Sequence, residues 1–208
     1  RDIIMGLISN GTTVFDAGAM SLGGSMVFIK KLTASGSGTL SFVDGASGVV
    51  LDNTYKEYVF TFNNIHPDGD QRDLTFNGSI DSGSNYNVTK TTTWFEALHW
   101  EDDSAAQAGY NTGVDLAQGT GFQTISSNLG NANDDNCSGF MHLFNPSSTT
   151  FVKHFTCTAS HNYRVGVPGE IHAHIAGYFN TTSAIDAVQF KMESGNVDAG
   201  TICLYGIS

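Results

Sequence analysis

The segment Trp94–Trp100 brings two tryptophans and a glutamate into one short stretch of the chain. As a β-strand it would direct alternate side chains to opposite faces. One face would carry Trp94, Glu96, Leu98 and Trp100, and the other Phe95, Ala97 and His99. Cleavage of a glycosidic bond needs two carboxylates that flank a stacked sugar. Glu96 with Glu101 or Asp102 is the best catalytic candidate, but solvated acids at a strand end explain these residues more simply.

The same aromatic residues also suit binding without catalysis. Exposed tryptophan rings offer a stacking platform for sugars, whereas large aromatic side chains more often lie in a core or a subunit contact. We favour core or subunit contact and keep glycan contact as the alternative. The candidate carbohydrate or receptor contacts are Trp94, His99, Trp100 and Tyr110.

The sequence predicts no metal site, no cofactor and no catalytic centre. It contains no Gly-X-Ser-X-Gly elbow, His-Glu-X-X-His pair, P-loop or dinucleotide fingerprint. Histidines on neighbouring strands could bind zinc between subunits, although histidines on a polar sheet face are commoner. These histidines are His142, His154, His172 and His174. The acidic turn Asp68–Asp70 with Asp73 matches no complete calcium loop. We therefore expect a protein that is not an enzyme.

The formal charge of −11 at pH 7 argues against nucleic acid as a partner. The Lys and Arg residues form no run longer than Lys30-Lys31, so a phosphate backbone would be repelled. No apolar stretch is long enough to span a bilayer, and Asp2–Ile8 is too short for a signal peptide. The three cysteines are isolated and odd in number, which predicts buried free thiols. They are Cys137, Cys157 and Cys203.

Composition and pattern predict an all-β fold, an antiparallel β-sandwich of two packed sheets. Gly 24 against Pro 3, with only 14% charged residues, suits short strands joined by tight turns. Short β-branched and aromatic runs begin at Met26 and are separated by turn pairs such as Asn77-Gly78. The expected strands are Met26–Leu32, Thr39–Val43, Glu57–Asn63, Asp73–Ile80, Tyr86–Thr91, Trp94–His99, Phe122–Ser126, Gly139–Phe144, Phe151–Thr158, Glu170–Phe179, Ala187–Met192 and Gly200–Gly206.

Alternation of apolar and polar residues is clearest late in the chain, where it predicts the core. One face of the strand Glu170–Phe179 is apolar, while His172, His174 and Tyr178 point the other way. The predicted core residues are Phe151, Phe155, Cys157, Ile171, Ala173, Ile175, Phe179, Val188, Phe190, Met192, Ile202 and Leu204.

The chain divides into residues 1–25, a glycine-rich N-terminal arm, and residues 26–208, the sandwich. The arm shows no sustained period, so it would gain stability by lying on another surface. Glu101–Asn136 is the least regular part of the sandwich and predicts long loops around one short strand. Loops of that length at a sandwich end are where binding surfaces usually lie.

Separated segments in the same order resemble a family of virion structural proteins encoded by marine bacteriophages. The segments are Asn85–Thr93, Leu143–Phe155, Ala176–Ser183, Ala187–Val197 and Gly200–Ile207, and the resemblance extends from about Met26 to Ser208. Proteins of that family are usually described as structural or tail-fibre proteins. The resemblance implies a jelly-roll-like domain displayed on the surface of a phage particle, without an active site.

Two roles follow from that resemblance. In the first, the chain is a tail-fibre or appendage domain that attaches to a host-surface glycan. In the second, it is a capsid decoration protein that the N-terminal arm anchors. Either role implies contact with other virion proteins through the arm and association with copies of itself, with a trimer as one arrangement. A secreted carbohydrate-binding protein or glycosidase is the third alternative.

Overall fold

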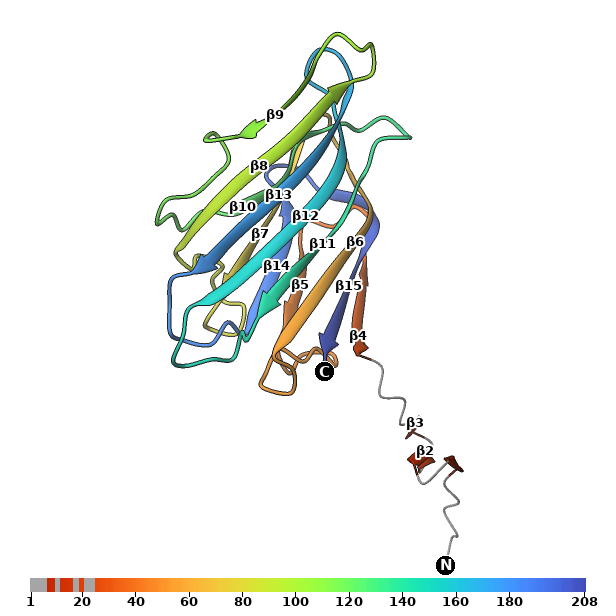
Figure 1. Ribbon diagram of the computed structural model, residues 1–208, viewed down its shortest axis with the longest axis vertical. Coiled ribbons are helices and arrows are strands. Elements are labelled where there is room, and N and C mark those ends of the chain that lie inside the picture. Colours follow the sequence, from red (N-terminus) through yellow and green to blue (C-terminus); the bar gives the residue numbers. More distant parts are fainter. Residues whose placement is uncertain (1–6, 10–11, 17–18, 21–24) are drawn as a thin grey trace, which may run out of the picture.

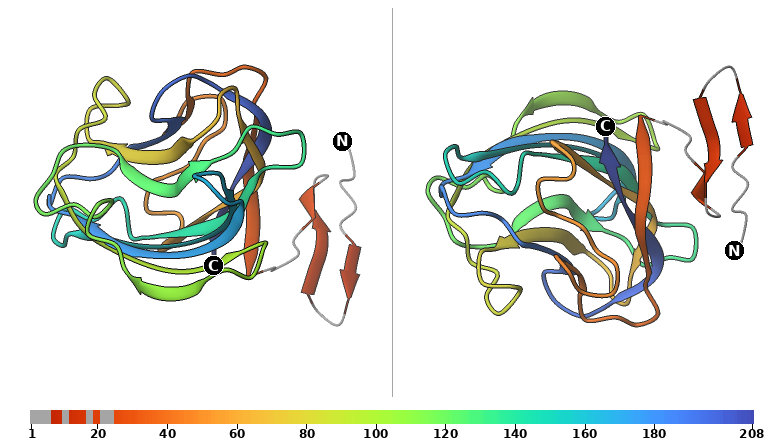
Figure 2. Two further views of the ribbon diagram at one scale, coloured as in Figure 1. Left: turned by 90° about the horizontal axis from the view of Figure 1, so that it is seen from above. Right: turned by 90° about the horizontal axis from the view of Figure 1, so that it is seen from below.

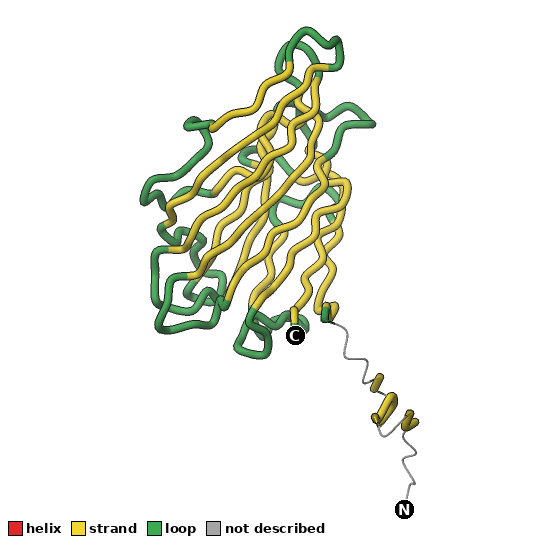
Figure 3. Tube along the Cα trace, viewed as in Figure 1, coloured by secondary structure: helices red, strands yellow, loops and turns green. Residues whose placement is uncertain are grey.

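The computed structural model describes residues 7–9, 12–16, 19–20 and 25–208, and every regular element in them is a β-strand. The all-β prediction is confirmed: twelve antiparallel strands form a jelly-roll-like sandwich of two layers, here called the larger and the smaller sheet, which are joined where Leu129 pairs with Tyr163 (Figures 1 and 3). No helix in the described part of the chain is long and apolar enough to cross a membrane.

The larger sheet forms the front layer in Figure 1, and the views along the strands in Figure 2 show the second layer behind it. Its strand order is β4 (Met26–Thr33), β15 (Val197–Ile207), β6 (Glu57–Pro67), β11 (Cys137–Phe144), β12 (Lys153–Tyr163), β13 (Gly169–Phe179), β8 (Lys90–Trp100) and β9 (Ala106–Tyr110). The smaller sheet has the order β10 (Gln123–Leu129), β7 (Arg72–Ser79), β14 (Ala187–Met192) and β5 (Leu40–Val43). From β4 to β8 the chain alternates between the two sheets, as in other jelly rolls.

The predicted arm is described only in part. Its described residues form three short strands that pair in a sheet of their own. These strands are β1 (Leu7–Ser9), β2 (Thr12–Asp16) and β3 (Ala19–Met20), and they were not predicted. The remaining positions of the segment up to residue 24 lie outside the described residues.

Aromatic contacts between the two sheets dominate the core. The ring of Phe190 on β14 lies 5.3 Å from those of Phe60 and Phe62 on β6, and 6.3 Å from that of Phe42 on β5. Such edge and tilted ring contacts add stabilisation beyond the burial of their area. Phe190 therefore joins the smaller sheet to the larger one.

The predicted core is confirmed with one exception. Residues 171, 173, 175 and 179 are buried, and the histidines between them are exposed. Cys137 and Cys157 are buried free thiols, and Cys203 is half-buried. Phe151 is the exception, because it is 69% exposed in the turn before β12, where its N–H donates to Ser148 Oγ.

Two local predictions are wrong for reasons of hydrogen bonding and packing. The chain from Tyr86 to Thr89 is not a strand; the Tyr86 carbonyl accepts from the side-chain amide of Asn77 instead of a ladder partner. Asn77-Gly78 is not a turn but lies within β7, where a Cβ on Gly78 would meet the Phe179 ring at 2.9 Å.

The buried Lys90 ammonium connects β8 to the smaller sheet. Its Nζ donates to Asn77 Oδ1 at 2.8 Å, to the Gly121 carbonyl at 2.6 Å and to the Val88 carbonyl at 3.0 Å. The amide of Asn77 donates in turn to the carbonyls of Thr120 and Gly121. A buried charge is tolerated only with such partners. The network therefore holds the segment before β10 against Lys90 of β8.

The Lys90 network predicts a pH dependence of stability. Burial lowers the pKa of Lys90 from 10.5 to about 7, so between these values the unfolded chain binds a proton that the folded protein lacks. Stability then rises with pH through this window. From about pH 7 to about pH 10, we expect the free energy of unfolding of wild type minus that of Lys90→Met to increase by a few kcal/mol, at about 1.4 kcal/mol per pKa unit. Urea denaturation at both pH values measures it, and a constant difference would contradict the buried, titrating amine.

Candidate functional site

A cleft of about 200 Å³ opens where the edge of the larger sheet separates from the smaller one. Side chains of β8, β9 and β12 line it from the larger sheet, and side chains of β7 and β10 line it from the smaller one. The polar and aromatic lining residues are Asp73, Glu96, Trp100, Gln107, Asn111, Ser127, Asn128 and Tyr163. An adjoining hollow of about 280 Å³ shares Glu96, Gln107 and Asn111 and has Tyr110 at its rim.

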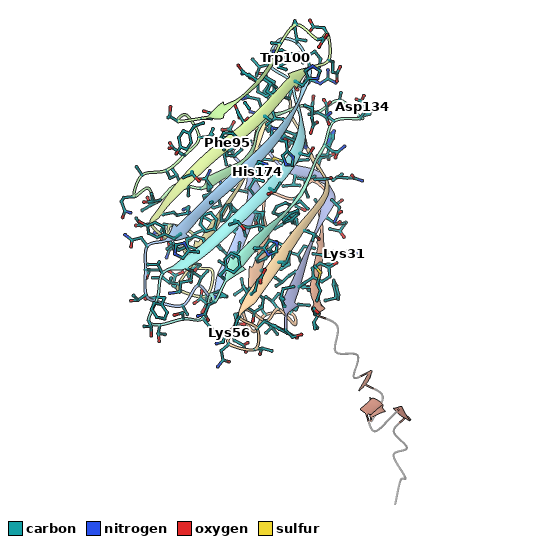
Figure 4. All side chains as sticks on the ribbon, viewed as in Figure 1. Lys31, Lys56, Phe95, Trp100, Asp134 and His174 are labelled. Carbon is teal, nitrogen blue, oxygen red and sulfur yellow. The ribbon has the colours of Figure 1, made fainter. Side chains whose placement is uncertain are left out.

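Two aromatic rings form the apolar wall of the cleft. Trp100 ends β8 and Tyr163 ends β12, and their ring centroids are 5.4 Å apart at an interplanar angle of 55°. Figure 4 shows Trp100 at the end of β8. Both side chains are half-buried and pack against the core, so their position is fixed by the sandwich while part of each ring stays accessible.

Two carboxylates face the cleft from opposite sheets. Glu96 accepts a hydrogen bond from the indole N–H of the fully buried Trp94 at 2.9 Å. Asp73 accepts from the Asn128 backbone N–H at 2.8 Å. Burial raises the pKa of Asp73, and the charge of Glu193 adds to this, while the Asn128 N–H opposes it. Burial, followed by the charges of Glu96 and Asp73, raises the pKa of Tyr163, so both carboxylates act on this hydroxyl.

A β-bulge directs polar groups into the cleft. The pairing of β10 with β7 shifts register between Ser126 and Leu129. Asn128, inside the bulge, has a φ of 50°, a left-handed conformation that asparagine adopts more readily than most residues. Bulges commonly re-aim side chains next to functional sites. Here the bulge brings Ser127 and Asn128 to the cleft, where Asn128 also binds Asp73.

The structure separates the four predicted contact residues. Trp100 lies in the cleft, whereas Trp94 is fully buried and belongs to the core, so a platform of two exposed tryptophans does not form. His99 lies on the outer face of β8 and pairs with Asp103 at 3.1 Å. Tyr110 is 51% exposed, and its hydroxyl donates to Asp115 at 2.5 Å.

The carboxylate partner of Glu96 is also different from the predicted one. Glu101 and Asp102 lie in the exposed turn that follows β8, and neither lines the cleft. Asp73 on β7, distant in sequence, takes that place. The alternation of Trp94–Trp100 correctly puts Glu96 and Trp100 on one face. The sequence indicated Asp73 only as part of an acidic turn, and it gave no signal for Asn128 or Tyr163.

The four histidines lie on neighbouring strands, as predicted. His172 and His174 share the outer face of β13, with ring centroids 4.6 Å apart. His142 forms a hydrogen bond with Glu57. Within the part of the chain that the structure describes, no three His, Cys, Asp or Glu side chains gather closely enough to hold a metal ion.

No family model, curated protein or solved structure matches the chain. The class of site is therefore defined by its geometry alone. Aromatic rings, side-chain amides and carboxylates line a small cleft, which is a combination suited to a ligand with apolar C–H faces and many hydroxyl groups.

The link between Trp94 and Glu96 gives a stability prediction that separates the structural role of Glu96 from any role in binding. Glu96→Leu leaves the buried indole N–H without an acceptor, which costs about 1–3 kcal/mol. Glu96→Gln keeps an acceptor oxygen and should stay within about 1 kcal/mol of wild type. Urea denaturation measures both, and equal stabilities of the two variants would show that the indole hydrogen bond is unimportant.

Proposed function

We propose that this chain is a non-enzymatic structural protein of a bacteriophage particle, a tail-fibre or appendage domain that attaches to a host-surface glycan through the cleft. The observation that carries the attachment is the gathering of Trp100, Tyr163, side-chain amides and two carboxylates in one cleft. The assignment to a phage particle rests on the resemblance of the sequence segments to virion proteins.

The chemistry of the cleft favours a sugar. The rings of Trp100 and Tyr163 can pack on the C–H face of a sugar ring, as aromatic side chains do when one side of the ligand is apolar. Gln107 and Asn111 supply both donors and acceptors, and Glu96 and Asp73 supply acceptors for neighbouring hydroxyls. At about 200 Å³ the cleft is below the ~300–1,000 Å³ of pockets for drug-sized ligands. It therefore suits a chain end or one sugar unit of a polymer.

The charge of the protein narrows the class of glycan. A net charge of −11 and two carboxylates in the cleft would repel a polymer that carries phosphate or uronic acid groups. The ligand is accordingly a neutral glycan. Weak binding by a small cleft is sufficient in an appendage, because copies on one particle bind the same surface together and multiply the affinity.

Capsid decoration is the second candidate, with residues 1–25 as the anchor to other virion proteins. It is favoured by one observation: the described strands of this segment pair with each other in their own sheet and not with the sandwich. A segment with separate pairing is suited to attachment elsewhere.

Trp100→Ala tests glycan attachment. Loss of the ring should weaken binding to a neutral host-surface polysaccharide about tenfold or more, which equals about 1.4 kcal/mol. His99→Ala is the matched control, because its side chain projects from the opposite face of the same strand and should leave binding unchanged. Titration calorimetry with purified polysaccharide measures both variants. Undiminished binding by Trp100→Ala would remove the cleft as the attachment site.

Immunogold labelling of intact particles tests the virion role. Label at the tail or fibre tips is expected for an attachment domain. Label spread over the head would replace that role with capsid decoration, and unlabelled particles would contradict both roles. A particle known to contain the antigen by mass spectrometry provides the positive control.

A further inference from the structure

We propose that the outer face of the larger sheet, over β11, β12, β13, β8 and β9, is the surface through which two copies of this chain associate. This face is separate from the cleft, which lies between the sheets. The proposal therefore does not depend on glycan binding.

Exposed aromatic side chains gather on this outer face. Phe95 is 49% exposed, Tyr110 51%, Phe140 44% and Phe144 37%. Phe95 pairs directly with Tyr110 on β9 and with His174 on β13, and Figure 4 shows Phe95 on β8 and His174 on the neighbouring β13. Phe95 and Tyr110 adjoin on β8 and β9, while Phe140 and Phe144 lie on β11, with Thr158 and His174 between the two groups. Aromatic residues are enriched in the cores of protein interfaces.

The same face is almost free of charge. Glu170 is the one Asp, Glu, Lys or Arg among the outward positions of these strands, which are described throughout, and it accepts a hydrogen bond from Ser160. The chain as a whole has 20 acidic residues against 9 basic ones. Aromatic enrichment with depletion of charge is the compositional signature of an interface core. Two copies, each with a charge of −11, would meet few opposing acidic groups through this face, because Glu170 bonds to Ser160 and the acids at its margin, Glu57 and Asp115, bond to His142 and Tyr110.

The face has two hollows beside its projecting rings. A hollow of about 270 Å³ has the small side chains of Thr93, Thr156 and Ala176 in its floor and Tyr178 at its wall. A second hollow of about 270 Å³ shares these small residues and is bounded by Phe95 and His174. In a two-fold pair, identical surfaces meet, so the projecting rings of each copy can enter the hollows of the other.

The dimensions of the face match a dimer. Strands about 4.8 Å apart and about 30 Å long give a face about 24 Å wide and about 700 Å² in area. Stable interfaces bury about 800 Å² on each partner. The hollows are too open to enclose a small ligand, whereas the flat sheet of a second copy can cover all of them by packing at about 10 Å, as stacked sheets do.

Sedimentation velocity of the full chain over a concentration series tests this proposal. We expect a dimer for wild type and a monomer for Phe95→Asp, because the second copy would bury the new carboxylate without a partner. Phe151→Asp is the matched control, since Phe151 is exposed in the turn before β12, outside the face, and should leave the dimer intact.

A wild-type monomer up to about 100 μM, far above the ~1 μM Kd of a modest interface, would overturn the proposal. A dimer that Phe95→Asp does not weaken would overturn it as well. Circular dichroism confirms that the variant stays folded, and Thr93→Arg, which fills the hollows instead of replacing a ring, should also yield a monomer. Trp100→Ala should remain dimeric, so failure of the interface and failure of glycan binding can be told apart.

Discussion

The Lys90 ammonium imposes the constraint on which the cleft depends. Once buried, its donors need oxygen partners, and these come from β7, from the segment before β8 and from the segment before β10. The strands that supply Glu96, Asp73 and Asn128 are therefore held in one arrangement by the hydrogen bonds of a single side chain. The Phe190 cluster closes the sandwich mainly by burying apolar area, an interaction that is not directional. The hydrogen bonds of Lys90 require defined directions, so they fix how the strands around the cleft lie relative to one another.

Most of the fold could be predicted from sequence because most strands carry an apolar face that must be buried. The strand Ala187–Met192 was predicted to the residue, and β13 to within one residue. The prediction failed where backbone carbonyls bond to side chains instead of to a neighbouring strand. It also failed where a strand shows no alternation of apolar and polar residues. Tyr86–Thr91 looks like a strand, yet its carbonyls serve Asn77 and Lys90. Strand β9, Ala106–Tyr110, consists largely of residues with low β-propensity and was hidden in the predicted loop.

Of the site, only the relations between residues of one strand could be predicted from the sequence. Alternation in Trp94–Trp100 correctly related Glu96 to Trp100, because that relation is local. It could not tell which tryptophan lies under the smaller sheet and which at its edge. Asp73 and Tyr163 enter the cleft through long-range packing, and Asn128 through a bulge that depends on register with β7. Such relations arise from tertiary structure and leave no periodic signal.

The strand order of the larger sheet places the N-terminal segment and the cleft at opposite edges. Residues 1–25 lead into β4 at one edge of that sheet, while the cleft lies under β8 and β9 at the opposite edge (Figure 1). With strands about 4.8 Å apart, this separates the two by about 34 Å. A domain tethered through the segment before β4 would present the cleft at the edge of the sheet farthest from the tether. The outer face of the larger sheet extends over β8 and β9 as well, whereas the cleft opens on the inner side of these strands.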